Sequence, residues 1–301
     1  MLLTRPESKS MEMRMTVSGS INEEQATLWN GSAGRAWIQV QSLLDRVLEP
    51  FEDLLVRAVA TRSAHRVLDV GCGTGATTLA VARLLGVNGE VVGVDISEPM
   101  ISVARARAAH DGSTATFFRA DAQTHPFEPA TFDLITSRFG VMFFEDPVCA
   151  FANLRRAATV DAELYLFAWR SAAENPFMTT AERAAAPLLP NIPSREPNAP
   201  GQFAFADSGR VARILEEGGW ADIDIQPLDI PCVFPEKELV HYFTQLGPLG
   251  RALHEADEPT RARIIETVRA AFNPYVDRDE VRFNAACWKI SAQSTLSSAS
   301  K

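Results

Sequence analysis

Three aspartates and a glycine-rich loop stand where buried apolar segments end. Asp69 precedes the loop Gly71–Gly75, and Asp95 and Asp121 follow two later apolar runs. An acid at the end of a buried strand can accept hydrogen bonds from the 2′ and 3′ hydroxyls of a ribose. Glycine reaches backbone angles that a Cβ forbids and lets a ligand lie against the main chain. The pattern indicates a binding site for a nucleoside-containing ligand.

The segments that must position these groups alternate between strand and helix patterns. The run 66–70 ends in the glycine loop and opens into helical spacing over 76–82, which predicts the first half of a βαβ unit. Ser97 and Pro99 are start signals for the next helix. Because ligands bind beyond the carboxyl ends of parallel strands, the three aspartates should meet at one edge of the sheet. Further strands are expected at 91–95, 116–119, 131–137 and 163–169.

The remaining segments predict additions to this sheet. Trp29 and Trp37 flank two glycines in a helical region, which indicates either a lid over the ligand or a helix break packed on the core. We expect an α/β fold, a Rossmann-like doubly wound seven-stranded sheet with the last strand antiparallel and helical cap additions. The expected organisation is a flexible tail (1–20), an N-terminal helical lid (21–60), a ligand-binding core (61–175), a cap insertion (176–206), the rest of the core with a helical insertion at 235–280 (207–292), and a second flexible tail (293–301).

Composition narrows the classes of partner. The chain has 38 acidic and 29 basic residues and a net charge of −9, so a nucleic-acid backbone would be repelled. The four cysteines form no C-x-x-C pair, which predicts neither a metal site nor a disulfide framework. The sequence contains no run of the ~18 apolar residues that a membrane span needs. Residues 1–20 contain no apolar signal region, and we expect a cytoplasmic protein. The sequence specifies no oligomeric state.

Two kinds of nucleoside cofactor fit the glycine loop. Gly71–Ala76 has the spacing G-x-G-x-x-A of a dinucleotide site with Asp95 as the ribose acid, so an NAD(P)-dependent oxidoreductase is an alternative. Asp69 favours another ligand, because its carboxylate would repel a pyrophosphate but could bind an ammonium group. No tyrosine is followed four residues on by lysine, the pair common in short-chain oxidoreductases.

The stretch Val67–Gly75 reads V-L-D-V-G-C-G-T-G and resembles the first motif of the class I S-adenosylmethionine-dependent methyltransferases. Phe132–Ile135 matches the F-D-x-[VI] pattern of the same family. Val141–Phe144 with Asp146-Pro147 is similar, more loosely, to the H-[HW]-F-x-D-P region of the ubiquinone and menaquinone methyltransferases. The resemblance covers roughly residues 60–170. Ser137–Gly140 stands where enzymes that methylate exocyclic amino groups carry [ND]-P-P-[YF], which disfavours those substrates.

The resemblance implies S-adenosyl-L-methionine as the cofactor and a small-molecule methyl acceptor as the partner. In this family an acid such as Asp121 binds the adenine amino group, and the next backbone NH, that of Ala122, meets a ring nitrogen. A catalytically silent partner subunit with the same fold is a further alternative. The implied cofactor-binding residues are Asp69, Gly71, Gly73, Gly75, Asp95, Ile96, Met100, Asp121, Ala122 and Ser137.

Methyl transfer requires alignment of donor and acceptor more than a fixed set of catalytic groups. His241 and Tyr242, with His254 nearby, are the candidate bases, because they lie in the last insertion and histidine suits proton transfer near neutral pH. Aromatic residues cluster after the fourth and fifth strands, which predicts an apolar or aromatic acceptor. The candidate acceptor-binding residues are Arg138, Phe139, Phe143, Trp169 and Phe177.

Overall fold

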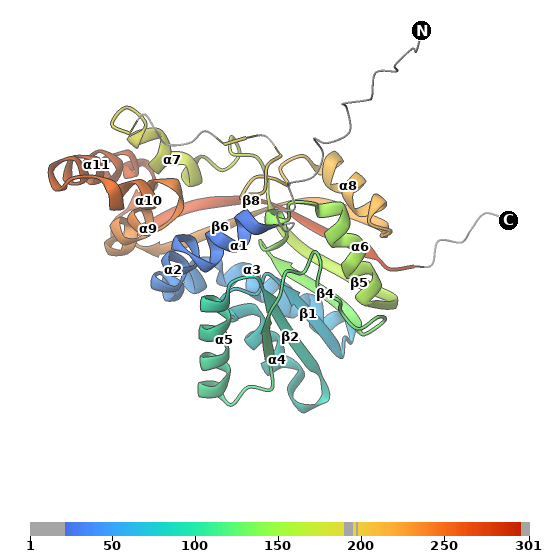
Figure 1. The fold of residues 1–301 in the computed structure, drawn as a ribbon. Coiled ribbons are helices and arrows are strands. Elements are labelled where there is room, and N and C mark those ends of the chain that lie inside the picture. The colour runs from blue at the N-terminus through green and yellow to red at the C-terminus, as the bar shows by residue number, and fades with distance from the viewer. Residues whose placement is uncertain (1–21, 190–194, 197, 296–301) are drawn as a thin grey trace, which may run out of the picture.

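Extended segments pair side by side to form the central sheet of the computed structural model, which describes residues 22–189, 195–196 and 198–295 (Figure 1). Within them the strand order is β3-β2-β1-β4-β5-β8-β6, and the short β7 pairs with β8. The strands are β1 (Arg66–Val70), β2 (Glu90–Asp95), β3 (Thr116–Arg119), β4 (Phe132–Arg138), β5 (Ala158–Trp169), β6 (Ala221–Pro235), β7 (Val276–Asp277) and β8 (Glu280–Gln293).

Strand directions follow the expected pattern. β1 pairs in parallel with β2 and β4, β2 with β3, and β4 with β5, whereas β8 runs antiparallel to both β5 and β6. The expected sheet with its antiparallel last strand is therefore confirmed. Parallel strands require crossover helices, and these place the carboxyl ends of β1, β2 and β4 at one edge.

The crossover helices cover the sheet. Helix α3 (Gln41–Arg62) packs against α4 (Ala76–Leu85), while α6 (Pro147–Ala157) packs against α8 (Ser208–Glu217). Helix α5 (Glu98–Asp111) runs beside β2 and β3, and its first turn is capped by Ser97, whose Oγ accepts from the Met100 NH at 3.4 Å. Across the described ranges, no helix is both long and apolar enough to span a bilayer.

A helical cap lies beside the end of β6 and the start of β8, the two longest strands of the described sheet (Figure 1). Its helices contact one another: α7 (Pro176–Ala185), α9 (Leu239–Gln245), α10 (Gly247–Glu255) and α11 (Glu258–Ala271). The sequence does not predict α10, because Gly247, Pro248 and Gly250 are residues typical of loops. Pro248 instead occupies the first turn, where its missing NH costs nothing. Strand β6 runs to Pro235, where the expected helical insertion 235–280 begins.

The N-terminal helical region divides into two parts. Helix α1 (Glu23–Asn30) and helix α2 (Ser32–Gln39) are separated by Gly31, whereas α3 buries Phe51 and Leu55 in the core. A Cβ at Gly34 would lie 2.0 Å from the Trp29 carbonyl oxygen, so glycine is required where the two short helices meet. The region 21–60, which we expect to form a lid, thus consists of two short helices, α1 and α2, followed by a long helix, α3, that packs in the core. The predicted tails 1–20 and 296–301 lie outside the described residues.

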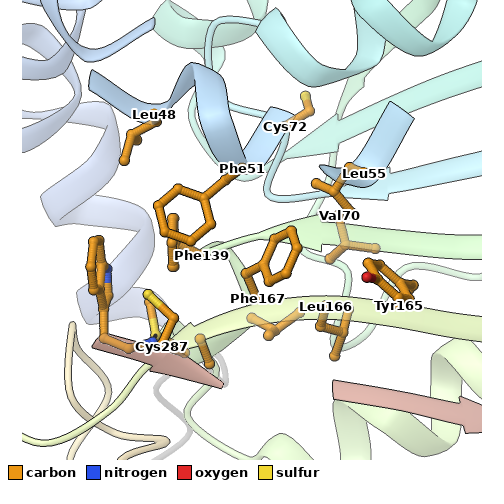
Figure 2. Close-up of a cluster of buried hydrophobic side chains, with 14 of the residues drawn as sticks. Leu48, Phe51, Leu55, Val70, Cys72, Phe139, Tyr165, Leu166, Phe167 and Cys287 are labelled. Atoms are coloured by element: carbon orange, nitrogen blue, oxygen red, sulfur yellow. Dashed lines mark hydrogen bonds between the residues drawn. The ribbon is translucent and has the colours of Figure 1, made fainter. Parts of the chain in front are cut away.

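An aromatic cluster joins α3 to the ends of β4 and β5. Figure 2 shows Phe51 pointing toward Phe139 and Phe167, with ring centroids 5.0 and 5.4 Å away. Phe139 stacks on Trp169 at 4.3 Å. Because Phe51 is completely buried and its neighbours come from separate elements, this cluster fixes where the fourth strand delivers its last residues.

Replacing Phe51 by alanine should lower the free energy of unfolding by about 3–5 kcal/mol, the range for a buried phenylalanine whose cavity cannot collapse. Urea unfolding followed by circular dichroism measures the change. Val87→Ala is the control, because that side chain is 91% exposed and its loss should be nearly neutral. A loss below 1 kcal/mol for Phe51→Ala would show that the cluster does not hold α3 on the sheet.

Candidate functional site

The loop Gly71–Gly75 leaves β1 with backbone that glycine alone adopts without strain. Gly71 has φ +68°, and a Cβ there would lie 2.6 Å from the Gly140 Cα. At Gly73, φ is +57° and a Cβ would lie 3.0 Å from the Met100 Cε. Both residues line a cavity at the carboxyl edge of the sheet. A ligand there meets main chain rather than side chains.

Gly75 does not line this cavity, contrary to expectation. A Cβ at Gly75 would lie 2.9 Å from the Phe117 Cζ and 3.0 Å from the Ala104 Cβ. The residue therefore allows α4 to begin close to β3 and α5, and its φ of +87° ends the loop. Its role is in packing.

Ser137 is also not a cavity residue. Its Oγ donates to the Val70 carbonyl at 2.7 Å and accepts from the Gly140 NH at 3.1 Å. The side chain is fully buried between the ends of β1 and β4. Ser137, a predicted cofactor-binding residue, thus joins the two strand ends and is not among the residues that line the cavity.

Asp95 ends β2 and braces the glycine loop. One carboxylate oxygen accepts from the Gly73 NH and the other from the Ser97 NH, each at 2.9 Å. Burial raises the pKa of Asp95, and these backbone hydrogen bonds oppose the rise. Each oxygen of an ionised carboxylate has two lone pairs, so both keep an acceptor position for a ribose hydroxyl. Ile96 and Met100 line the adjoining wall.

Asp121 and Ala122 follow β3 and present complementary groups. The Asp121 Oδ1 accepts from the Gln123 NH at 3.0 Å and from the Asn22 Nδ2 at 3.2 Å. The Ala122 carbonyl accepts from the Asn153 Nδ2 at 2.9 Å, while its NH has no acceptor among the described residues. An acceptor beside a free donor matches the amino group and ring nitrogen of an adenine edge.

Two side chains of opposite charge, Asp69 and Arg138, line the same cavity. Asp69 is buried, and its Oδ2 accepts from the Thr78 Oγ1 at 2.6 Å. Burial raises the pKa of Asp69 to about 6, opposed by that hydrogen bond and by Arg138. Arg138 donates to the Leu48 carbonyl at 3.3 Å, and its Nη1 lies 4.0 Å from the Glu52 carboxylate. Burial lowers the pKa of the Arg138 guanidinium. The pair could hold the two ends of an amino acid.

Thr77 adds an uncommitted donor at this end. Its Oγ1 is buried and has no hydrogen-bond partner within the described ranges, and the residue lines the cavity in the first turn of α4. An orphaned hydroxyl beside Asp69 and Arg138 fits a polar ligand group better than an apolar one.

The cavity continues without interruption beneath the cap and has a volume of about 470 Å³. Its far half is mainly apolar, with polar groups at Glu182, Arg195, Gln202, Gln245 and Arg251. Glu182 is paired with Arg195 at 2.6 Å. The apolar wall includes Trp29, Phe143, Trp169, Phe177, Met178, Ala181, Leu246, Leu249 and Phe272. One continuous cavity therefore joins the glycine loop to a chamber suited to an apolar molecule.

The predicted acceptor residues Arg138, Phe139, Phe143, Trp169 and Phe177 all line this cavity. Phe143 contacts the lid, with its ring 5.1 Å from that of Trp29. Phe177 is mainly a core residue of the cap, because it is buried and stacks on Phe283 at 4.0 Å. Sequence periodicity cannot separate these roles, since an aromatic residue between two layers serves both.

The candidate bases do not come together at the donor end. His241, a predicted base, is exposed on α9 and does not line the cavity, so the structure does not bring it to the donor end. Tyr242 does line it, and its hydroxyl lies 3.7 Å from the Met178 sulfur. Burial raises the pKa of Tyr242, which keeps the phenol protonated at neutral pH. Tyr242 can donate a hydrogen bond but is a poor base. His254 lies on α10.

Sequence reasoning overlooked several cavity residues. Asn22, Gln25, Thr77, Glu182 and Gln202 are ordinary polar residues on helices or loops. Their only sequence signal is the Asn-x-x-Gln spacing at the start of α1, which is typical of a helix cap rather than a site.

Comparison with known proteins finds a matching domain around this site. A methyltransferase domain matches residues 67–160, which hold the glycine loop and all three predicted ligand-binding aspartates. The ubiquinone/menaquinone biosynthesis C-methyltransferase UbiE of Saccharophagus degradans is 36% identical over 108 residues, which are 35% of this chain and 43% of that protein. The matched region thus spans less than half of that relative.

Two further likenesses extend over more of the chain. An uncharacterized protein of Mycobacterium tuberculosis is 28% identical over 204 residues, covering 68% of this chain and 71% of its own. The crystal structure of YcgJ from Bacillus subtilis has a TM-score of 0.54 at 19% identity and covers 81% of this chain and 98% of its own. The latter shows the fold alone. Sequence match, fold and site agree: residues 67–160 carry a methyltransferase domain, whose cofactor is S-adenosylmethionine.

Proposed function

We propose that this protein transfers a methyl group from S-adenosylmethionine to a small, largely apolar or aromatic molecule, at an oxygen or a carbon atom. The observation that carries the proposal is the single cavity that joins the glycine loop and the aspartates to the apolar chamber beneath the cap. A site for cofactor alone would not need that chamber. Its wall of aromatic and aliphatic side chains is typical of pockets for small ligands.

Each end of the cofactor has a matching group. We assign Asp95 to the ribose hydroxyls and Asp121 with the Ala122 NH to the adenine edge. Asp69 faces the ammonium group, and Arg138 lies where it can bind the carboxylate of the same amino acid. Asp69 argues against a dinucleotide, because its buried carboxylate would repel a pyrophosphate at the glycine loop.

When bound, S-adenosylmethionine supplies an electrophilic methyl carbon on a sulfonium. The chain's residues hold the acceptor in line with that carbon and exclude water, and alignment of this kind contributes several kcal/mol to catalysis, on the order of 7–11 at its largest. Phe143 and Trp169 line the same cavity as the glycine loop. Tyr242 retains its proton and orients the acceptor by donating a hydrogen bond.

The direct test is transfer of a labelled methyl group from S-adenosylmethionine to a panel of phenols, quinols and enols. Label in an extracted apolar product, lost in Asp95→Ala protein, would support the proposal. Label that enters nucleic acid instead, or substrate oxidation that depends on NAD, would contradict it. A folded protein that binds the cofactor but labels nothing in a whole metabolite extract would favour a silent partner subunit.

Ala181→Phe should block the acceptor half of the cavity. Ala181 lines the chamber on α7, and the added ring would occupy space that the acceptor needs. We expect methyl transfer to fall by at least about tenfold, equivalent to about 1.4 kcal/mol, with unchanged affinity for S-adenosylhomocysteine. Ala186→Phe is the matched control, because Ala186 ends the same helix on the exposed surface. Equal transfer by both variants would place the acceptor elsewhere.

Binding of S-adenosylhomocysteine should release a proton near pH 6. Asp69 has a pKa of about 6 in the free protein, so about half of it is protonated at that pH, and an ammonium group favours the carboxylate. Titration calorimetry in buffers of different ionisation enthalpy measures the release. It should disappear in Asp69→Asn and persist in Asp133→Asn, a carboxylate that accepts from His65 and Arg66 at the start of β1.

The coupling between protonation of Asp69 and folding can also be tested without ligand. Because the folded pKa of Asp69 is raised, its protonated form favours folding. Its contribution to stability is full below about pH 4 and is lost as the pH rises through 6. The free energy of unfolding should therefore depend less on pH between about 4 and 6 in Asp69→Asn. An unchanged pH dependence and unchanged proton release would show that Asp69 does not face the ammonium group.

A further inference from the structure

Two side-chain oxygens at the start of α1 are buried and lack a partner. The Asn22 Oδ1 and the Gln25 Oε1 have no hydrogen bond within the described ranges, and both residues line the cavity. Asn22 is 5% exposed. Buried acceptors left unpaired are rare in native proteins, because they lose their bonds to water without replacement. Two such atoms on one wall of the cavity indicate that a bound ligand supplies the missing hydrogen-bond donor.

The helix start explains why these oxygens are free. Asn22 and Gln25 have the spacing of a capping box, in which each side chain would bond the other residue's NH. Neither bond forms here. Asn22 has φ 72° and makes no side-chain cap, and its NH donates instead to the Glu145 carboxylate at 2.5 Å. The two side-chain oxygens are therefore not used in capping the helix, and they remain free to accept hydrogen bonds from a ligand in the cavity.

Their position coincides with the adenine end of the cofactor site. The Asn22 Nδ2 donates to the Asp121 Oδ1 at 3.2 Å, so the free Oδ1 of the same amide lies beside that carboxylate. Gln25 follows one helical turn later, on the same face. Polar contacts of Asn22 thus tie the lid directly to the loop that follows β3.

The far end of α1 is tied to the ribose end. The Asn30 Nδ2 donates to the Ile96 carbonyl at 3.0 Å, and the Asn30 Oδ1 accepts from the Glu98 NH at 2.9 Å. The Ser97 Oγ donates to the Trp29 carbonyl at 2.7 Å. Helix α1 therefore bridges the loops that carry Asp95 and Asp121, with its two orphaned oxygens between.

We propose that Asn22 and Gln25 bind the exocyclic amino group of the cofactor's adenine, so that the N-terminal helix reads the base as it covers it. The inference rests on the proposed function. An amino group offers two N–H donors, of which Asp121 takes one and the α1 oxygens the other. A keto group at the same position would place an acceptor against these acceptors. The lid is therefore selective for adenine over hypoxanthine.

Titration calorimetry with S-adenosylhomocysteine and S-inosylhomocysteine, which differ at that position, tests the proposal. The native protein should prefer the adenine ligand, and Gln25→Leu should reduce that preference by about tenfold, because one acceptor is removed. Asn22→Gly should reduce it similarly, since glycine keeps the left-handed backbone without the amide. Glu24→Leu is the matched control on the exposed face of the same helix and should keep the native preference.

The outcomes separate the inference from the function. An unchanged preference in both Gln25→Leu and Asn22→Gly would overturn the inference while leaving the cofactor site intact. Failure of the native protein to bind S-adenosylhomocysteine would instead contradict the proposed function. Far-ultraviolet circular dichroism and the unchanged Glu24→Leu variant would show that altered preference does not arise from unfolding of α1.

Discussion

The site depends on a close approach between two main chains at the carboxyl ends of β1 and β4. A Cβ at Gly71 would lie 2.6 Å from the Gly140 Cα, and a Cβ at Gly140 would lie 2.7 Å from the Gly71 Cα. No side chain can stand between the strands there. Ser137 stabilises this contact, because its Oγ donates to the Val70 carbonyl and accepts from the Gly140 NH. The floor of the cavity is consequently backbone, and the acids on either side can reach a ligand that lies on it.

Helices α1 and α3 and the helical cap surround that floor. The Phe51 cluster fixes α3 against the strand that delivers Arg138 and Phe139. The long ends of β6 and β8 carry the cap over the same edge, and α1 closes the remaining side by bonding two of its loops (Figure 1). Elements that are distant in sequence therefore line one continuous cavity.

Much of this could be predicted from the sequence because the signals are local. Buried parallel strands are continuous apolar runs, and the glycine loop with Asp69, Asp95 and Asp121 follows directly from strand ends. Side-chain direction is not local. Ser137 stands at the right position, but its side chain bonds the Val70 carbonyl, and His241 faces outward from a short helix whose rotation is set by its neighbours. The orphaned oxygens of α1 arise from a capping box that the tertiary structure leaves unmade.

Hydrogen exchange with and without S-adenosylhomocysteine tests the central claim most directly, because it reports both binding and its location. The account predicts slower exchange in the glycine loop, after β2 and β3, and across α1 and α2, with no change on addition of NAD. Protection by NAD over the same segments, or exchange unaffected by S-adenosylhomocysteine, would contradict it.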